Sequence, residues 1–99
     1  LKTIELISIK DILYLEADRK YTIFHLNDKK KKVVSKNIGE YEKILPKNLF
    51  FRIHHKYIVN VQKVTTINRS DGNYCQLIDG KTLTIAKRRQ EAIRKFLYL

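Results

Sequence analysis

Runs of strand-forming residues follow one another along most of the chain. They are TIELISI, ILYLEA, YTIFHL, VVS, LFFRI, YIVNVQKVTTI, YCQLI and KTLTI. In YTIFHL, alternate residues point to opposite faces, which is typical of a half-buried strand. β-Branched and aromatic residues favour the same structure. The pattern predicts roughly nine or ten short strands, mostly antiparallel because the connections are too short for parallel crossovers.

Two segments show helical spacing instead. Apolar residues recur on one face from 38 to 45, Asn37 can cap this helix, and Pro46 ends it. The last segment, KRRQEAIRKFLYL, places Ile93 and Phe96 on one helical face. The expected fold is therefore mainly β with minor α, having one short middle helix and one C-terminal helix.

Turn-forming residues separate the strands. Asp79-Gly80 lies between YCQLI and KTLTI and favours a hairpin with a type I′ turn. RSDGN predicts another turn, in which Gly72 can adopt a positive φ. Asp18, Arg19 and Lys20 form a polar stretch between two strand runs, which predicts a short hairpin loop.

The length allows one domain, which we expect to span residues 1–99. At 43% hydrophobic and 31% charged, the chain is too apolar for a disordered protein. Its apolar runs are too short to cross a bilayer, and the N-terminus lacks the features of a signal peptide. A start without Met suggests a piece of a longer protein. Cys75 is the single cysteine, which favours a protein of a reducing compartment, the cytoplasm. Cys75 itself is expected to lie in the hydrophobic core.

A formal net charge of +11 is the strongest compositional signal. Such a field favours polyanions, although lysine-rich surfaces also serve solubility. Basic residues recur in four clusters at expected loops or element ends: Arg19-Lys20, Lys29 to Lys32, His54-His55-Lys56 and Lys87-Arg88-Arg89. Cations at loop tips can contact phosphates, and Arg, Lys and His side chains can donate to base edges in a major groove. Taken alone, the four-lysine run is most simply a solvated turn.

The histidines do not predict a metal site. His54 and His55 are adjacent, so on a strand they would point to opposite faces, and His25 is distant in sequence. The chain has no GxSxG turn, P-loop or GxGxxG motif. We therefore expect no enzyme activity, no catalytic residues, no metal and no cofactor.

Several residues near the basic clusters have a structural interpretation. His54 is expected to be half-buried and to bond a backbone group, whereas His55 is the better candidate for an exposed contact. Asn60 interrupts an apolar strand, so its amide must be satisfied by backbone groups. The tyrosines could form a stacking platform, but their scattered positions favour packing.

The combination of these segments resembles the LytTR-type DNA-binding domain. DILYLEADRKYTIFHL, FFRIHHKYIVNVQKV and LIDGKTLTIAKRR carry the resemblance, which covers about Leu6 to Leu97. The family commonly has F-x-R-x-H-[RKN]-S-[YF]-[IVL]-V-N. This chain matches at Phe50, Arg52, His54, Tyr57, Val59 and Asn60. It departs from the pattern at three positions. His55 stands where Arg, Lys or Asn is common, Lys56 replaces the usual Ser, and Ala86 lies where Ser often caps the final helix.

The resemblance implies an elongated domain of stacked antiparallel sheets with a small helix beside them. It implies a cytoplasmic bacterial transcription regulator that binds direct repeats in promoter regions, usually joined to an N-terminal receiver domain. Three family loops enter successive major grooves. They fall here on Arg19-Lys20, on His55-Lys56 and on Lys87-Arg88-Arg89.

These observations lead to a specific hypothesis about the contacts. Lys20, His55 and Arg88 are the expected contacts to bases. The expected contacts to phosphates are Arg19, Lys56, Lys87 and Arg89. The partner is double-stranded DNA, and the function is sequence-specific binding as the output domain of a two-component response regulator. Two alternatives remain open: a nonspecific nucleic-acid or RNA-binding β module, and a module that binds an acidic protein.

Overall fold

The computed structural model describes residues 4–68 and 73–98, and within them it contains eight strands and two α-helices. The strands are β1 (Ile12–Asp18), β2 (Tyr21–Leu26), β3 (Lys31–Val34), β4 (Phe50–His54), β5 (Tyr57–Asn60), β6 (Val64–Asn68), β7 (Tyr74–Leu77) and β8 (Thr82–Thr84). The helices are α1 (Ile38–Ile44) and α2 (Gln90–Phe96), and short 3-10 helices are η1 (Ile9–Asp11), η2 (Asn27–Lys29), η3 (Val61–Lys63) and η4 (Lys87–Arg89).

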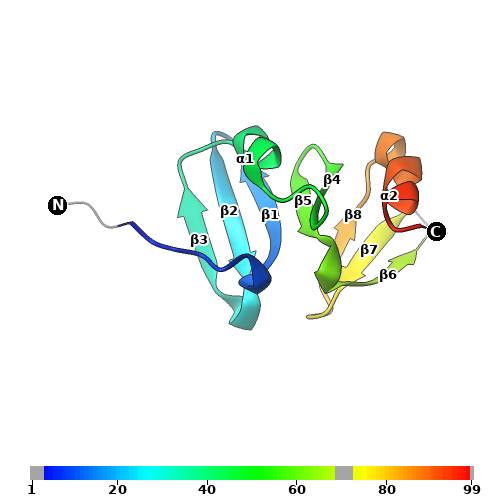
Figure 1. Ribbon diagram of the computed structural model, residues 1–99, viewed down its shortest axis with the longest axis horizontal. Helices are drawn as coiled ribbons and strands as arrows, with labels where there is room; N and C mark the ends of the chain where they lie inside the picture. Colours follow the sequence, from blue (N-terminus) through cyan, green and yellow to red (C-terminus); the bar gives the residue numbers. More distant parts are fainter. Residues whose placement is uncertain (1–3, 69–72, 99) are drawn as a thin grey trace.

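The strands form two antiparallel sheets. The larger has the order β3-β2-β1-β5-β4, and the smaller has the order β6-β7-β8. The sheets follow one another along the long axis of a molecule that measures 50 × 25 × 22 Å (Figure 1). The expected mainly β, elongated architecture is thus confirmed.

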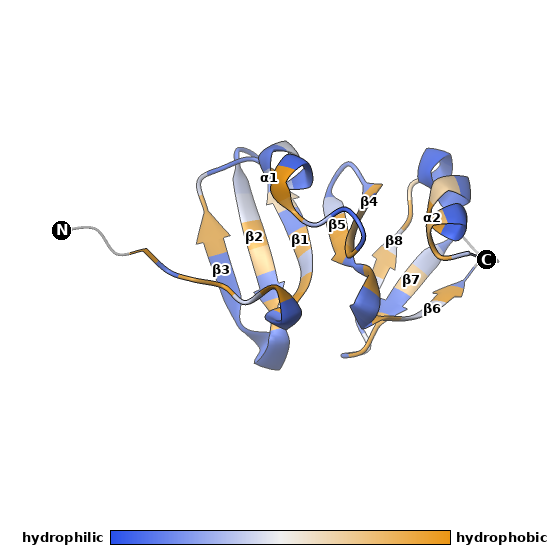
Figure 2. Cartoon of the chain, in the orientation of Figure 1, coloured by the Kyte–Doolittle hydropathy of each residue, from blue (hydrophilic) through white to orange (hydrophobic). Residues whose placement is uncertain are grey.

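The five-stranded sheet packs against other elements on both of its faces, which gives the domain two hydrophobic clusters. One face packs on α1 through a cluster that includes Leu15, Phe24 and Ile38. The other packs on the three-stranded sheet and α2 through a cluster that includes Val59 and Ile93. Polar residues cover the turns at both ends of the strands (Figure 2). The two clusters hold the loops in fixed positions relative to one another.

Both predicted helices are present. The side chain of Asn37 caps α1 by accepting a hydrogen bond from the backbone N–H of Glu40 at 3.1 Å. Ile93 is the buried residue of α2. No side chain caps η4, which begins after Ala86, as expected where alanine replaces serine.

Three expectations about strands were wrong in detail. TIELISI does not pair with another strand over the described residues, and Ile4 and Leu6 remain 85% and 92% exposed. YIVNVQKVTTI is two strands, because η3 carries the chain from one sheet to the other. The strand expected at VVS begins earlier, so Lys31 and Lys32 lie in β3 and not in a turn.

The β7–β8 hairpin also differs from its prediction. The Gly80 N–H donates to the Leu77 carbonyl at 2.9 Å, and Gly80 has a φ of 90°. Asp79 has no positive φ, so the turn is not type I′. A three-residue loop that ends in a left-handed glycine is the next common hairpin solution. The turn expected in RSDGN lies mostly outside the described residues.

Candidate nucleic-acid interface

The β1–β2 turn presents the first pair of basic residues. Arg19 and Lys20 are exposed, and Arg19 has a left-handed φ of 58°. The Lys20 ammonium lies 5.7 Å from the centroid of the Tyr21 ring, close enough for a cation–π contact. Two residues connect the strands, so both side chains are held at the end of these two strands.

The β4–β5 turn presents His55 and Lys56, and Arg52 organises its backbone. Arg52 Nε donates to the His54 carbonyl at 2.9 Å, and Nη2 donates to the His55 carbonyl at 2.5 Å. The remaining donor, Nη1, bonds Glu42 Oε1 at 2.6 Å. Glu42 lies on α1, so the helix and the turn share one guanidinium group.

The side chain of His54 also bonds the backbone of this turn. Its Nδ1 accepts a hydrogen bond from the Lys56 backbone N–H at 3.1 Å, so the neutral ring carries its proton on Nε2. Burial lowers the pKa of His54, and electrostatic interactions with His55, Lys56 and Arg52 lower it further. The structural role expected for His54 is confirmed. His55 is exposed at the tip.

A polar network within the sheet reaches the same turn. Glu16 Oε1 bonds His25 Nε2 at 2.8 Å, and Glu16 Oε2 lies 3.9 Å from Lys56 Nζ. The His25 ring stacks on Tyr14, with centroids 4.1 Å apart and planes 9° apart. Burial lowers the pKa of His25, although its hydrogen bond to Glu16 opposes this effect.

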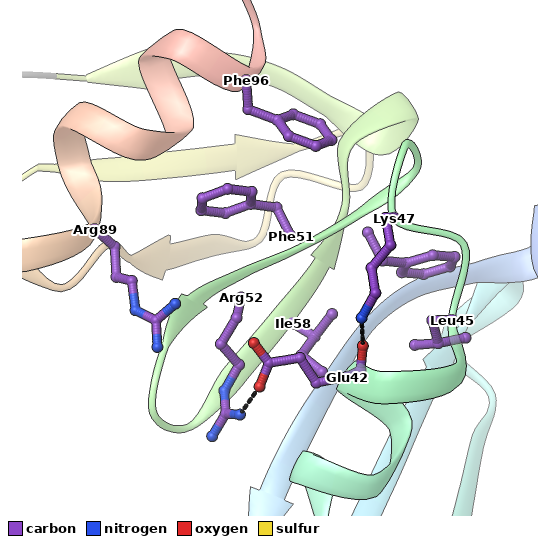
Figure 3. Close-up of a pocket in the computed structure, with 9 residues that line it drawn as sticks. Glu42, Leu45, Lys47, Phe51, Arg52, Ile58, Arg89 and Phe96 are labelled. Atoms are coloured by element: carbon purple, nitrogen blue, oxygen red, sulfur yellow. Dashed lines mark hydrogen bonds and ion pairs between the residues drawn. The ribbon is translucent and has the colours of Figure 1, made fainter.

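The third basic segment is η4, which leads into α2. Lys87 and Arg88 are exposed, whereas Arg89 is partly buried. Figure 3 shows Arg89 beside a cavity of about 250 Å³ that Glu42 and Arg52 also line. Three cations therefore open the last helix, as the sequence predicts.

The three segments lie along one long edge of the domain. β1 and β4 both run antiparallel to β5, so the turns that follow them lie at the same end of the strands. The Ala17 N–H donates to the Lys56 carbonyl, and the Ala86 N–H donates to the Ile53 carbonyl, both at 2.8 Å. These bonds tie the first turn to the second and the second to η4. All three segments lie on the upper side of Figure 1.

The fourth basic cluster is not part of this edge. Lys29, Lys30 and Lys31 follow β2, which runs antiparallel to β1, so they lie at the opposite end of the strands. The structure thus brings three of the four basic clusters together and separates the fourth.

The expectation about histidine orientation was wrong. His54 ends β4 at a register shift, and the His54 and His55 ring centroids are 4.4 Å apart instead of lying on opposite faces. In the described ranges, no group of three or more His, Cys, Asp or Glu residues is placed to hold a metal ion. No helix of the described chain is long and apolar enough to cross a membrane.

Sequence reasoning missed Glu42. It lies ten residues before Arg52, on the other side of Pro46, and no local pattern predicts the pair. Arg52 and Asn60 were expected to be structural, and both are. Asn60 is 1% exposed, donates to the Ile12 carbonyl at 2.9 Å and accepts from the Gln62 N–H at 3.0 Å.

Cationic loops along one side of an elongated antiparallel β domain are suited to contact a polyanion such as a nucleic acid. The family model described as the LytTr DNA-binding domain matches residues 2–98, so the chain belongs to this family. The resemblance found in the sequence is confirmed, and DNA binding is the activity of the family.

Two similar proteins agree with this assignment. A LytTr DNA-binding domain from a Bacillus cereus protein, described as a methyl-accepting/DNA response regulator, superposes with a TM-score of 0.86. It is 24% identical, and the match covers 94% of this chain and 86% of that one. The positive alginate biosynthesis regulatory protein of Pseudomonas aeruginosa is 28% identical over 107 residues. That match covers 98% of this chain but only 40% of the relative.

Proposed function

We propose that this domain binds duplex DNA sequence-specifically by placing three loops in successive major grooves. The base-reading residues are Lys20, His55 and Arg88, one from each segment. Arg19, Lys56, Lys87 and Arg89 contact phosphates. A major groove is about 12 Å wide and admits such loops, and Arg or Lys can donate to guanine O6 and N7.

The single observation that carries this proposal is the alignment of the three segments. Backbone hydrogen bonds at 2.8 Å link the first turn to the second and the second to η4. The spacing between the basic side chains is therefore built into the fold before DNA binds. Preorganised contacts lose less conformational entropy on binding than mobile ones, which favours specific over diffuse attraction.

The three segments follow one another along the long axis of the domain, as successive grooves follow one another along a duplex, which supports contact with more than one groove (Figure 1). The proposal extends to the wider context of a bacterial two-component response regulator whose output domain regulates transcription. Its binding sites are direct repeats in promoter regions, and its N-terminal partner in the full-length protein is a receiver domain. Relatives described as regulators and response regulators support this context.

The decisive experiment is selection of binding sites from a random duplex pool at about 150 mM salt, where charge attraction is screened beyond about 8 Å. The expected result is enrichment of a short motif, repeated about one helical turn apart. Binding without enrichment would replace the proposal with a nonspecific nucleic-acid module. Absence of binding would favour an acidic protein partner.

Alanine variants then assign the roles. Lys20→Ala, His55→Ala or Arg88→Ala should weaken binding by about 1–3 kcal/mol and relax the preference at one position of the motif. Arg19→Ala or Lys87→Ala should weaken binding to all sequences and flatten the salt slope by about one unit. Lys81→Ala removes an exposed cation from the opposite edge and is the control. Equal effects of all these variants would contradict base reading.

A further inference from the structure

The edge opposite the three loops carries a second cluster of cations. Lys29, Lys30 and Lys31 lie in the β2–β3 turn and at the start of β3, and Lys81 lies in the β7–β8 hairpin. All four side chains are exposed. Both turns lie on the lower side of Figure 1. Lysines some 50 residues apart in sequence are thus neighbours in the fold.

Hydrophobic side chains and a hollow accompany these lysines. A cavity of about 270 Å³ is lined by Lys29, Lys31 and Lys81, and an adjoining one of about 430 Å³ by Lys29 and Ile78. Leu13 lines both cavities. Ile78 is 54% exposed, so its apolar side chain is accessible to a partner beside these cations. We call this surface the lysine hollow.

The four lysines have no ionic partner in the described part of the chain. The ion pairs there involve other cations, including Lys32, which bonds Glu5. Lys31 and Lys81 line one cavity together with His25, and both lower the pKa of its partly buried ring. Asp28 and Asp79 lie among the four lysines, so the surface keeps a net charge of about +2, which an anionic partner would neutralise.

The backbone holds one of these lysines in an uncommon conformation. Asp28 and Lys29 have φ values of 62° and 60°, a pair of left-handed residues where Asn and Gly are preferred. The Leu26 N–H donates to the Lys30 carbonyl at 2.8 Å, and Asn27 Nδ2 donates to Asp11 Oδ1 at 3.2 Å. Left-handed non-glycine residues cluster at binding sites, where the surrounding structure maintains them.

We propose that the lysine hollow binds an acidic peptide segment with apolar side chains, supplied by a partner protein. The lysines pair with its carboxylates, and an apolar side chain packs against Ile78. The apolar part of the lining favours a peptide over a second duplex. Leu13 and Ile78 line the hollow, and a duplex has no apolar side chain to pack against them.

The test uses a synthetic ten-residue peptide that alternates Glu with Leu or Phe, titrated into the isotope-labelled protein at about 100 mM salt. Amide chemical shifts should change mainly in residues 26–31 and 78–81. A peptide of the same charge in which Ser replaces the apolar residues should bind several-fold more weakly, because the hydrophobic contact is lost.

Matched variants distinguish binding at the lysine hollow from a general attraction to the positive charge of the protein. Replacing Lys29, Lys31 and Lys81 together by Gln should raise the peptide Kd by about tenfold, the sum of three surface ion pairs. Replacing Lys36, Lys43 and Lys95 by Gln removes the same charge elsewhere and should change it less than about twofold.

Two variants that leave the net charge unchanged test the apolar contact. Ile78→Ser should weaken binding several-fold, whereas Ile44→Ser alters an even more exposed isoleucine on α1 and should not. The proposal is overturned if both lysine triples act alike, if the shifts map to the opposite edge, or if a 20-base-pair duplex perturbs residues 26–31 as strongly as the peptide does.

Discussion

At the level of single residues, Arg52 links α1 to the turn that presents His55. Its guanidinium bonds two turn carbonyls and Glu42. The negative charge of Glu42 opposes attraction to phosphates. Its position is best explained as orienting Arg52, which makes Glu42 a positioning residue for the turn.

Replacing Glu42 separates orientation from charge. Glu42→Ala should weaken binding to the selected site about fivefold to tenfold, because the turn loses its fixed geometry. Binding to random duplex should strengthen slightly, since one negative charge is removed. Both affinities are measured by fluorescence anisotropy. Glu40→Ala on the same helix removes the same charge without touching Arg52, and it should strengthen both. Parallel behaviour of the two variants would show that Glu42 acts by charge alone.

Asn60 is a second residue, and the effect of its replacement on stability can be predicted. Asn60→Ala leaves the Ile12 carbonyl and the Gln62 N–H without their partners, one of them in the core. The free energy of unfolding should fall by about 2–4 kcal/mol, measured by urea denaturation. Asn48→Ala changes an exposed asparagine and should cost less than about 0.5 kcal/mol. A similar loss in both variants would contradict the role assigned to the buried amide.

At the level of elements, α1 contributes both to the hydrophobic core and to the position of the β4–β5 turn. It packs Ile38 into one hydrophobic cluster and carries Glu42 at its other end. Only seven residues long, it depends on its cap and its packing, since so short a helix is marginal on its own.

The cap of α1 provides the corresponding prediction. Asn37→Ala should lower the free energy of unfolding by about 1 kcal/mol, because the Glu40 N–H loses its acceptor. Asn37→Ser can replace that acceptor and should retain most of the stability. Chemical denaturation of both variants checks this. If the two lose stability equally, the side-chain cap is not the source.

For the whole molecule, two histidines couple stability to pH. Burial is the main cause that lowers the pKa of both His25 and His54 in the folded state. In the unfolded chain both titrate near 6.5, so the unfolded state binds more protons as the pH falls below about 7. This stabilising contribution is complete above the unfolded pKa and is lost as the pH falls through the folded values.

The midpoint of urea unfolding should therefore decrease between about pH 7 and pH 5.5. In that range most carboxylates are still charged, so the histidines dominate the slope. A double variant with Gln at His25 and His54 should show a flatter profile, although its absolute stability will be lower. An unchanged slope in the double variant would assign the pH dependence to other groups.

Much of this organisation could be predicted from local sequence. Strand propensity located most of the described strands, and Asn37 and Pro46 marked the ends of α1 because capping and ring sterics act within a few residues. Propensity also placed a strand at TIELISI, but its described residues pair with no other strand. Strand formation needs a neighbouring strand, and no residue within TIELISI specifies one.

The sequence by itself determined the mainly β class, the two helices, the excess of positive charge and the family motif, since these follow from residue type and short spacing. The tertiary structure decided which cations lie together. It placed three basic segments on one edge and Lys29 to Lys31 on the other, because strand direction alternates in an antiparallel sheet. It also paired Glu42 with Arg52 across Pro46. Such pairings depend on how distant elements pack, which no local pattern specifies.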